Sequence, residues 1–255
     1  MRIKLISPTN PHSHKKEMDA TSIFDSSSLV LDLDNQNMLH NCTHTFGLIN
    51  SRIRRPLVKL FNAYKNEHET FPMHLGTFND LREIMIIDCN LTHLPETFGE
   101  LTNLQEMILG YNQLSSLPHN FGNLQNLQRI FLDNNQLTTL PESIGQLINL
   151  RDLNLNYNEL TTLPESIGQL INLRDLDLVF NQLTTLPESI GQLTNLQKLS
   201  LNYNQLTTLP ESIGDLKQLN YLNLSSNHLT TLPESIGDLK HLSTLILDYN
   251  VRVTN

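Results

Sequence analysis

Most residues able to perform chemistry lie near the N-terminus, which holds six of the ten histidines and Cys42, one of the two cysteines. Cys42 and His44 have the residue types of a thiol nucleophile and its base, but such a pair works only where the fold places the base against the thiol. No C-x-x-C pair and no H-E-x-x-H pattern is present, so the usual metal-ligand spacings are missing. The sequence therefore predicts a protein that is not an enzyme and that needs no metal or cofactor.

The charge and hydropathy of the chain narrow the classes of partner. The formal net charge is −9 at pH 7, and no basic stripe of the kind that nucleic-acid binding requires is present. No apolar run approaches the roughly 20 residues that a membrane-spanning helix needs. We therefore expect a protein partner, with neither nucleic-acid binding nor membrane insertion.

A 23-residue repeat organises most of the chain. The segment from Leu150 reads LRDLNLNYNELTTLPESIGQLIN, and the segment from Leu173 reads LRDLDLVFNQLTTLPESIGQLTN. A fixed period of this length indicates stacked units that share one continuous core, because no unit can bury its apolar face alone. Seven full repeats and a partial eighth fill residues 81–255, and they begin at Leu81, Leu104, Leu127, Leu150, Leu173, Leu196, Leu219 and Leu242.

Positions within the repeat have distinct expected roles. Residues 4 and 6 of each unit are apolar and are predicted to point inward from a short parallel strand. The L-P-E-S-I-G segment predicts a short helical turn, with proline at its first helical position and glycine letting the chain leave it. Position 9 is Cys89 in the first unit and asparagine in all others, where a buried amide would satisfy unpaired backbone groups. These asparagines are Asn112, Asn135, Asn158, Asn181, Asn204, Asn227 and Asn250.

The region before the repeats divides into a tail and a cap. Residues 1–28 are polar and are predicted to be a flexible tail. Residues 29–80 are predicted to be a mainly helical N-terminal cap, which contains a short strand over 29–33, an amphipathic helix over about 52–66 and a half repeat over 71–80.

The repeat resembles the leucine-rich repeat family, in its 23-residue class with L-P-x-x-I-G. The resemblance implies an α/β fold: a curved, right-handed leucine-rich-repeat solenoid with a parallel β-sheet on its concave face and short helical turns on its convex face. The near-identical units are most similar to those of secreted bacterial effectors of the Legionella-like group. This likeness implies a protein that is cytoplasmic in the producing cell or delivered to the host cytoplasm without a signal peptide.

Side chains at the outward positions of the strands are the candidates for partner binding. Position 5 is apolar in the first three units, although the N-terminal segment could instead cover those residues as core. Position 8 is rich in aromatic residues, which suit an interface or local packing within the repeat equally well. Acidic residues on the middle strands would set charge preference. The candidate residues are Met85, Ile87, Ile108, Tyr111, Phe131, Asp152, Tyr157, Asp175, Asp177, Phe180 and Tyr203.

The predicted function is non-catalytic protein binding through the concave face, as a bacterial effector that scaffolds or inhibits its partner. One alternative is a targeting array with a small activity in residues 1–80. Another is structural self-association through the C-terminal repeat, because Arg252 stands where the repeat expects an apolar residue and no capping helix follows.

Overall fold

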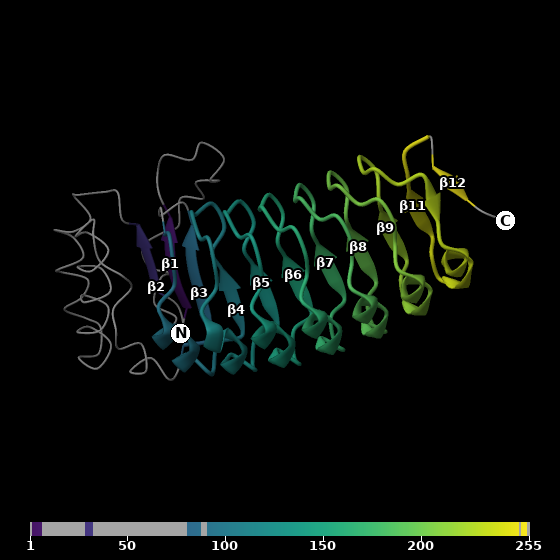
Figure 1. Cartoon of the computed structure of the whole chain (residues 1–255). Helices are drawn as coiled ribbons and strands as arrows, with labels where there is room; N and C mark the ends of the chain where they lie inside the picture. The colour runs from purple at the N-terminus through teal and green to yellow at the C-terminus, as the bar shows by residue number, and fades with distance from the viewer. Residues whose placement is uncertain (1, 7–28, 33–80, 88–90, 250, 254–255) are drawn as a thin grey trace, which may run out of the picture.

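The computed structural model describes residues 2–6, 29–32, 81–87, 91–249 and 251–253. Ten parallel strands form one sheet in the order β11-β9-β8-β7-β6-β5-β4-β3-β1-β2. Figure 1 shows the turns of the chain stacked side by side, with the strands in one row and the 3-10 turns in another. The strands are β1 (Arg2–Ile6), β2 (Leu29–Asp32), β3 (Glu83–Ile87), β4 (Glu106–Ile108), β5 (Arg129–Phe131), β6 (Asp152–Asn154), β7 (Asp175–Asp177), β8 (Lys198–Ser200), β9 (Tyr221–Asn223) and β11 (Thr244–Ile246).

A short 3-10 helix follows each strand from β3 to β9 on the opposite side of the solenoid. These turns are η2 (Glu96–Glu100), η3 (His119–Asn123), η4 (Glu142–Gln146), η5 (Glu165–Gln169), η6 (Glu188–Gln192), η7 (Glu211–Asp215) and η8 (Glu234–Asp238). In the described ranges, no helix is long and apolar enough to cross a lipid bilayer. The parallel sheet with its row of 3-10 turns confirms the predicted solenoid.

The core runs the length of the array between the strands and the turns. Leu153 and Leu155, at positions 4 and 6 of their repeat, are almost completely buried, as the alternation of apolar residues predicts. The equivalent residues of β3 to β9 are buried in the same way. The last repeat differs, because Leu245 at position 4 of β11 is 37% exposed. The side chain at position 4 is therefore covered by the next repeat of the solenoid, and no further repeat follows β11 among the described residues.

The proline and the glycine of the turn have roles other than the predicted ones. Pro141 precedes η4 with an extended backbone (φ −69°, ψ 148°), so proline caps the helix rather than occupying its first helical position. Its carbonyl accepts a hydrogen bond of 2.9 Å from the Ile144 N–H. Gly145 has no positive φ. Glycine is needed there because a Cβ would lie 2.5 Å from the Ser166 carbonyl oxygen of the next turn.

The buried asparagines form a ladder along one side of the core. Asn158 donates from Nδ2 to the carbonyls of Leu132 (3.0 Å) and Leu155 (3.1 Å), and its Oδ1 accepts from the Leu137 N–H at 3.0 Å. The ladder therefore links each turn to the one before it through groups that the bend leaves without strand partners, as predicted. Asn112, Asn135, Asn181, Asn204 and Asn227 repeat the arrangement, and Cys89 and Asn250 lie outside the described residues.

The N-terminal residues enter the sheet itself. Arg2–Ile6 form β1, which lies between β2 and β3, where the sequence predicted part of a flexible tail. The apolar residues of R-I-K-L-I alternate as in a repeat strand, and Ile3 pairs in register with Ile84. β2 falls within the segment predicted as a strand. Residues 7–28 and 33–80, with the predicted helix and half repeat, lie outside the described residues.

At the other end, β12 (Arg252–Val253) pairs in parallel with β10 (Thr231–Leu232) as a separate two-stranded sheet. Arg252 thus pairs with Thr231 of the previous repeat, although the repeat expects an apolar residue at this position. β11 remains the terminal strand of the main sheet.

Candidate protein-binding face

The outward positions of the strands form one surface, which we call the strand face: positions 3 and 5 of each repeat and the position 8 residue that follows. The parallel register places equal positions side by side from β3 to β11. Adjacent strands lie about 4.8 Å apart, so the side chains of one position form a row in contact distance of one another.

Three apolar side chains occupy the N-terminal part of position 5, and we call Met85, Ile108 and Phe131 the apolar row. They lie on adjacent strands in register, and each is half-buried. Asn154 and Asp177 continue the same row with polar groups. Ile87 ends β3 and pairs in register with Ile6 of β1, so the apolar row is flanked by β1 within the sheet.

Charged residues at position 3 pair along the sheet. Arg129 Nε and Nη2 donate to the two carboxylate oxygens of Glu106 at 3.2 and 2.7 Å. The hydrogen bond and charge of Glu106 raise the pKa of Arg129 above its ordinary value. Lys198 Nζ lies 3.3 Å from Asp175 Oδ2 and 5.9 Å from the centre of the Tyr221 ring. These pairs order the surface, although exposed ion pairs add little stability.

The three predicted acidic residues lie together but differ in environment. Asp152 and Asp175 are register partners, and Asp177 lies on the same strand as Asp175. Burial raises the pKa of the Asp175 carboxyl above its ordinary value, while Lys198 opposes this shift and Asp177 and Asp152 add to it. One carboxylate oxygen of Asp177 is buried without a hydrogen-bond partner. Lys198 neutralises part of the Asp175 charge, and the Asp152 carboxylate lies close enough to Arg129 to help raise the pKa of Arg129.

Three aromatic rings at position 8 stack on one another, and we call Tyr157, Phe180 and Tyr203 the aromatic ladder. Ring centres are 4.5 Å apart between Tyr157 and Phe180 and 4.1 Å between Phe180 and Tyr203. The rings are 50%, 38% and 48% exposed in chain order. The rings thus pack against one another from repeat to repeat while remaining partly exposed, and their predicted role in partner binding stays a prediction. Tyr111 is equally exposed but is separated from the ladder by Asn134.

Position 8 has an unusual backbone for such large residues. Tyr157, Phe180 and Tyr203 have φ values of 53°, 54° and 58°, in the left-handed region that side chains with a Cβ seldom adopt. The strained bend turns each N–H toward the next repeat, where Tyr157 donates to the Val179 carbonyl at 2.8 Å. The buried asparagine at position 9 follows directly after this bend.

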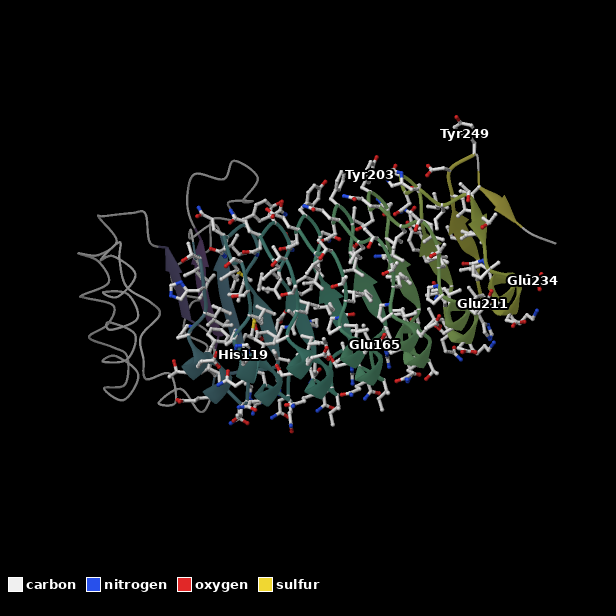
Figure 2. All side chains as sticks on the ribbon, in the orientation of Figure 1. His119, Glu165, Tyr203, Glu211, Glu234 and Tyr249 are labelled. Atoms are coloured by element: carbon white, nitrogen blue, oxygen red, sulfur yellow. The ribbon has the colours of Figure 1, made fainter. Side chains whose placement is uncertain are left out.

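The strand face and the acidic turns lie at different places on the solenoid. Figure 2 shows Tyr203 and Tyr249 at one edge of the array and Glu165, Glu211 and Glu234 along the row of 3-10 turns. Those glutamates are exposed first residues of their turns. Glu96 and Glu165 accept hydrogen bonds from backbone N–H groups of the next turn, so these carboxylates link neighbouring turns.

The sequence placed the residues of the apolar row beside one another and did the same for the three acidic residues. It did not predict the ion pairs or the ring stacking. The 23-residue register was the available signal, because it aligns Glu106 with Arg129 and Asp175 with Lys198. In the described part of the chain, no group of three or more histidine, cysteine, aspartate or glutamate side chains is arranged to hold a metal ion.

Comparison with known families and structures gives consistent results. The family described as leucine rich repeat matches residues 79–137 and 194–251, and the one described as leucine-rich repeat region matches residues 134–219. A leucine-rich repeat protein from Leptospira interrogans is 42% identical with a TM-score of 0.68, over 72% of this chain and 47% of that chain. Comparison with curated protein sequences found no match.

Two further solved structures are complexes. The ectodomain of the Arabidopsis thaliana receptor kinase GASSHO1/SCHENGEN3, in complex with Casparian strip integrity factor 2, is 32% identical with a TM-score of 0.58, over 73% of this chain and 26% of that chain. The Drosophila Toll–Spatzle complex is 30% identical with a TM-score of 0.60, over 69% and 24%. The chain spans less than half the length of each of these three structures.

Proposed function

Because the chain belongs to the leucine-rich repeat family, we propose that it is a non-catalytic protein that binds a protein partner on its strand face. Its fold is typical of protein–protein interaction modules. Two structurally similar proteins were solved as complexes, one with Casparian strip integrity factor 2 and one with Spatzle, which supports a protein partner here.

The observation that carries the proposal is the apolar row. Met85, Ile108 and Phe131 are half-buried neighbours on an outward face that is otherwise polar at position 5 from Asn154 to Asn223. Apolar side chains gathered on an outward face are a frequent mark of an interaction site. Burial contributes about 25 cal/mol per Å² of apolar surface, so covering three such side chains would supply several kcal/mol before the costs of association.

The neighbouring groups set what kind of partner the row would accept. The aromatic ladder offers ring edges and the Tyr157 and Tyr203 hydroxyls, since stacking covers both faces of Phe180. Asp152 and Asp177 favour a partner with some basic surface. A sheet held by repeated backbone hydrogen bonds needs no motion to scaffold a partner or to block its active surface.

The test is an affinity pull-down that compares two matched triple variants. Met85, Ile108 and Phe131 are replaced by aspartate in the first, and Asn154, Asn223 and Thr244, which are half-buried strand-face residues of other strands, are replaced by aspartate in the second. Both variants add three negative charges to the strand face. We expect one protein to be captured by the wild type and by the second variant but not by the first.

Circular dichroism must show that both variants keep their fold. Capture that survives in the first variant would remove the partner site from the apolar row, and loss in both variants would indicate a charge effect without a local site.

We also propose that the chain is a bacterial effector that acts in a host cytoplasm. The likeness to the Leptospira interrogans protein supports a bacterial origin for this repeat type. Expression of a tagged chain from bacteria during infection, followed by fractionation of host cells, tests delivery; a tag confined to the bacteria would contradict it.

Self-association is a second candidate, favoured by the terminal strand. Leu245 and Ile246 of β11 are each 37% exposed at the end of the main sheet, where strand edges offer unpaired backbone groups. Light scattering should then show a mass that rises with concentration, and a constant monomer mass would exclude this candidate. The alternative activity in residues 1–80 lies mostly outside the described residues and stays a prediction.

A further inference from the structure

A small polar pocket lies at the edge where the chain enters the middle strands. Its volume is about 140 Å³, and it is lined by Gln128, Asn149, Arg151, Asn172 and Arg174. Arg151 and Arg174 hold position 2 of adjacent repeats, directly before β6 and β7. The pocket is therefore separate from the apolar row on β3 to β5.

The pocket carries positive charge without a balancing acid. None of the five lining residues is a carboxylate. Over the described residues, Arg129 and Lys198 are paired with acids, whereas neither Arg151 nor Arg174 makes an ion pair. The adjacent acids in sequence, Asp152 and Asp175, belong to the strand face and do not line the pocket.

Backbone and amide hydrogen bonds fix the two arginines side by side. The Arg174 N–H donates to the Arg151 carbonyl at 2.8 Å, so their Cα atoms are held on neighbouring turns. Asn149 and Asn172 each donate from Nδ2 to a carbonyl of the preceding turn at 2.8 Å. Each amide keeps its second N–H and therefore has a donor to spare.

The repeat does not itself require arginine at this position. Position 2 is glutamine in three other repeats, at Gln105, Gln128 and Gln197. Like charges on neighbouring strands are destabilising unless something lies between them. Two adjacent guanidinium groups without acids, around a pocket lined by amides, are suited to an anion that they share.

We propose that this pocket binds an oxyanion, the carboxylate or phosphate group of a ligand. The planar fork of a guanidinium matches two oxygens of either group, and hydrogen bonds between charged groups are stronger than neutral ones. Asn149 and Asn172 complete the ring of donors. The site does not depend on the proposed protein partner, because it would bind the free anion as well.

The test is a titration of the ¹⁵N-labelled full chain with acetate and, separately, with inorganic phosphate, at ionic strength held constant with sodium chloride. We expect saturable NMR shifts of the Arg151 and Arg174 signals. Arg151→Gln and Arg174→Gln, which install the residue that other repeats carry, should each weaken the apparent affinity roughly tenfold. Arg82→Gln is the matched control, because Arg82 also stands at position 2 but the following repeat has Gln105 at that position.

The pattern of response decides the proposal. Saturation with acetate alone identifies a carboxylate site, saturation with phosphate alone a phosphate site, and saturation with both a general oxyanion site. The proposal is overturned if chloride gives equal shifts, if the two variants bind like the wild type, or if Arg82→Gln weakens binding equally. Arg174→Lys, which keeps the charge and removes the fork, should also weaken binding and guards against a folding defect in the glutamine variants.

Discussion

The inward and outward sides of the same strands follow different rules. Positions 4 and 6 hold apolar residues, and position 9 holds asparagine, in every repeat from Leu104 to Leu219. Positions 3, 5 and 8 change in nearly every repeat. The difference arises because an inward residue must fit the turns on both sides of it, whereas an outward residue faces solvent and can vary without disturbing the stack.

Two nearly identical repeats make this contrast clearest. The units that start at Leu150 and Leu173 differ only at positions 5, 7, 8, 10 and 22. Every one of those residues is half-buried or exposed. The shared frame specifies the fold, and the few differences lie where a partner could distinguish one turn from the next.

The largest effect should come from the asparagine ladder. Asn158→Ala removes the acceptor of the buried Leu137 N–H and the donor to the carbonyls of Leu132 and Leu155. Leaving these groups unsatisfied should cost about 3 kcal/mol in the free energy of unfolding, measured by urea denaturation. Asn195→Ala, which loses one exposed hydrogen bond to the Ile171 carbonyl, should cost about 1 kcal/mol or less. Equal losses of stability in the two variants would show that a buried asparagine contributes no more to stability than an exposed one.

The next effect concerns contact between turns. Gly145→Ala places a Cβ 2.5 Å from the Ser166 carbonyl oxygen, and the turns must move apart to admit it. We expect a loss of about 2 kcal/mol in the free energy of unfolding, because added volume in a packed contact is destabilising. Gly237→Ala is the matched control, since nothing lies within 4 Å of its Cβ, and its stability should stay within about 0.5 kcal/mol of wild type. A comparable loss of stability in both variants would show that glycine is needed for its backbone conformation and not for the close contact with the next turn.

A smaller effect is expected where an outward residue contributes to the stack. Phe180→Ala removes ring contacts with Tyr157 and Tyr203 and should cost about 1 kcal/mol. Phe180→Gly loses the same contacts but relieves the positive φ of 54°, so it should be roughly 1 kcal/mol more stable than the alanine variant. Chemical denaturation of the three proteins measures both differences. Equal stability of the alanine and glycine variants would contradict strain at position 8.

The smallest effect should be a pH dependence at Asp175. Its pKa in the folded protein is raised above the ordinary value, so the folded chain holds this proton more strongly than the unfolded chain. The contribution of Asp175 to stability therefore falls as pH rises through the raised pKa and is constant below the ordinary one.

Asp175→Asn removes this dependence while keeping the shape. Thermal melting should show the variant as stable as wild type or slightly more so at pH 7, with the difference shrinking as pH falls toward 4. A variant that is less stable at pH 7 would show that the bond to Lys198 outweighs the burial of the carboxylate.

The inward side was predictable because its rules are local and repeated. The burial of Leu153 and Leu155 follows from alternation, and the bonds of Asn158 follow from a polar residue in a core position. The cap role of Pro141 and the contact at Gly145 were not predictable, because both depend on how one turn lies against the next. The pairing of Arg129 with Glu106 was predictable from the register, but its two hydrogen bonds were not, because they depend on the conformations of both side chains.

The insertion of β1 has a consequence for how the chain folds. Ile3 pairs with Ile84, which is 81 positions away along the chain, whereas Ile84 pairs with Met107 only 23 positions away. Closing a longer loop costs more entropy, and contacts between distant residues form more slowly. During synthesis β1 is made before β3, and Ile3 cannot meet Ile84 until 81 further residues have been added. The repeats are therefore expected to assemble on one another before β1 joins the sheet beside β3.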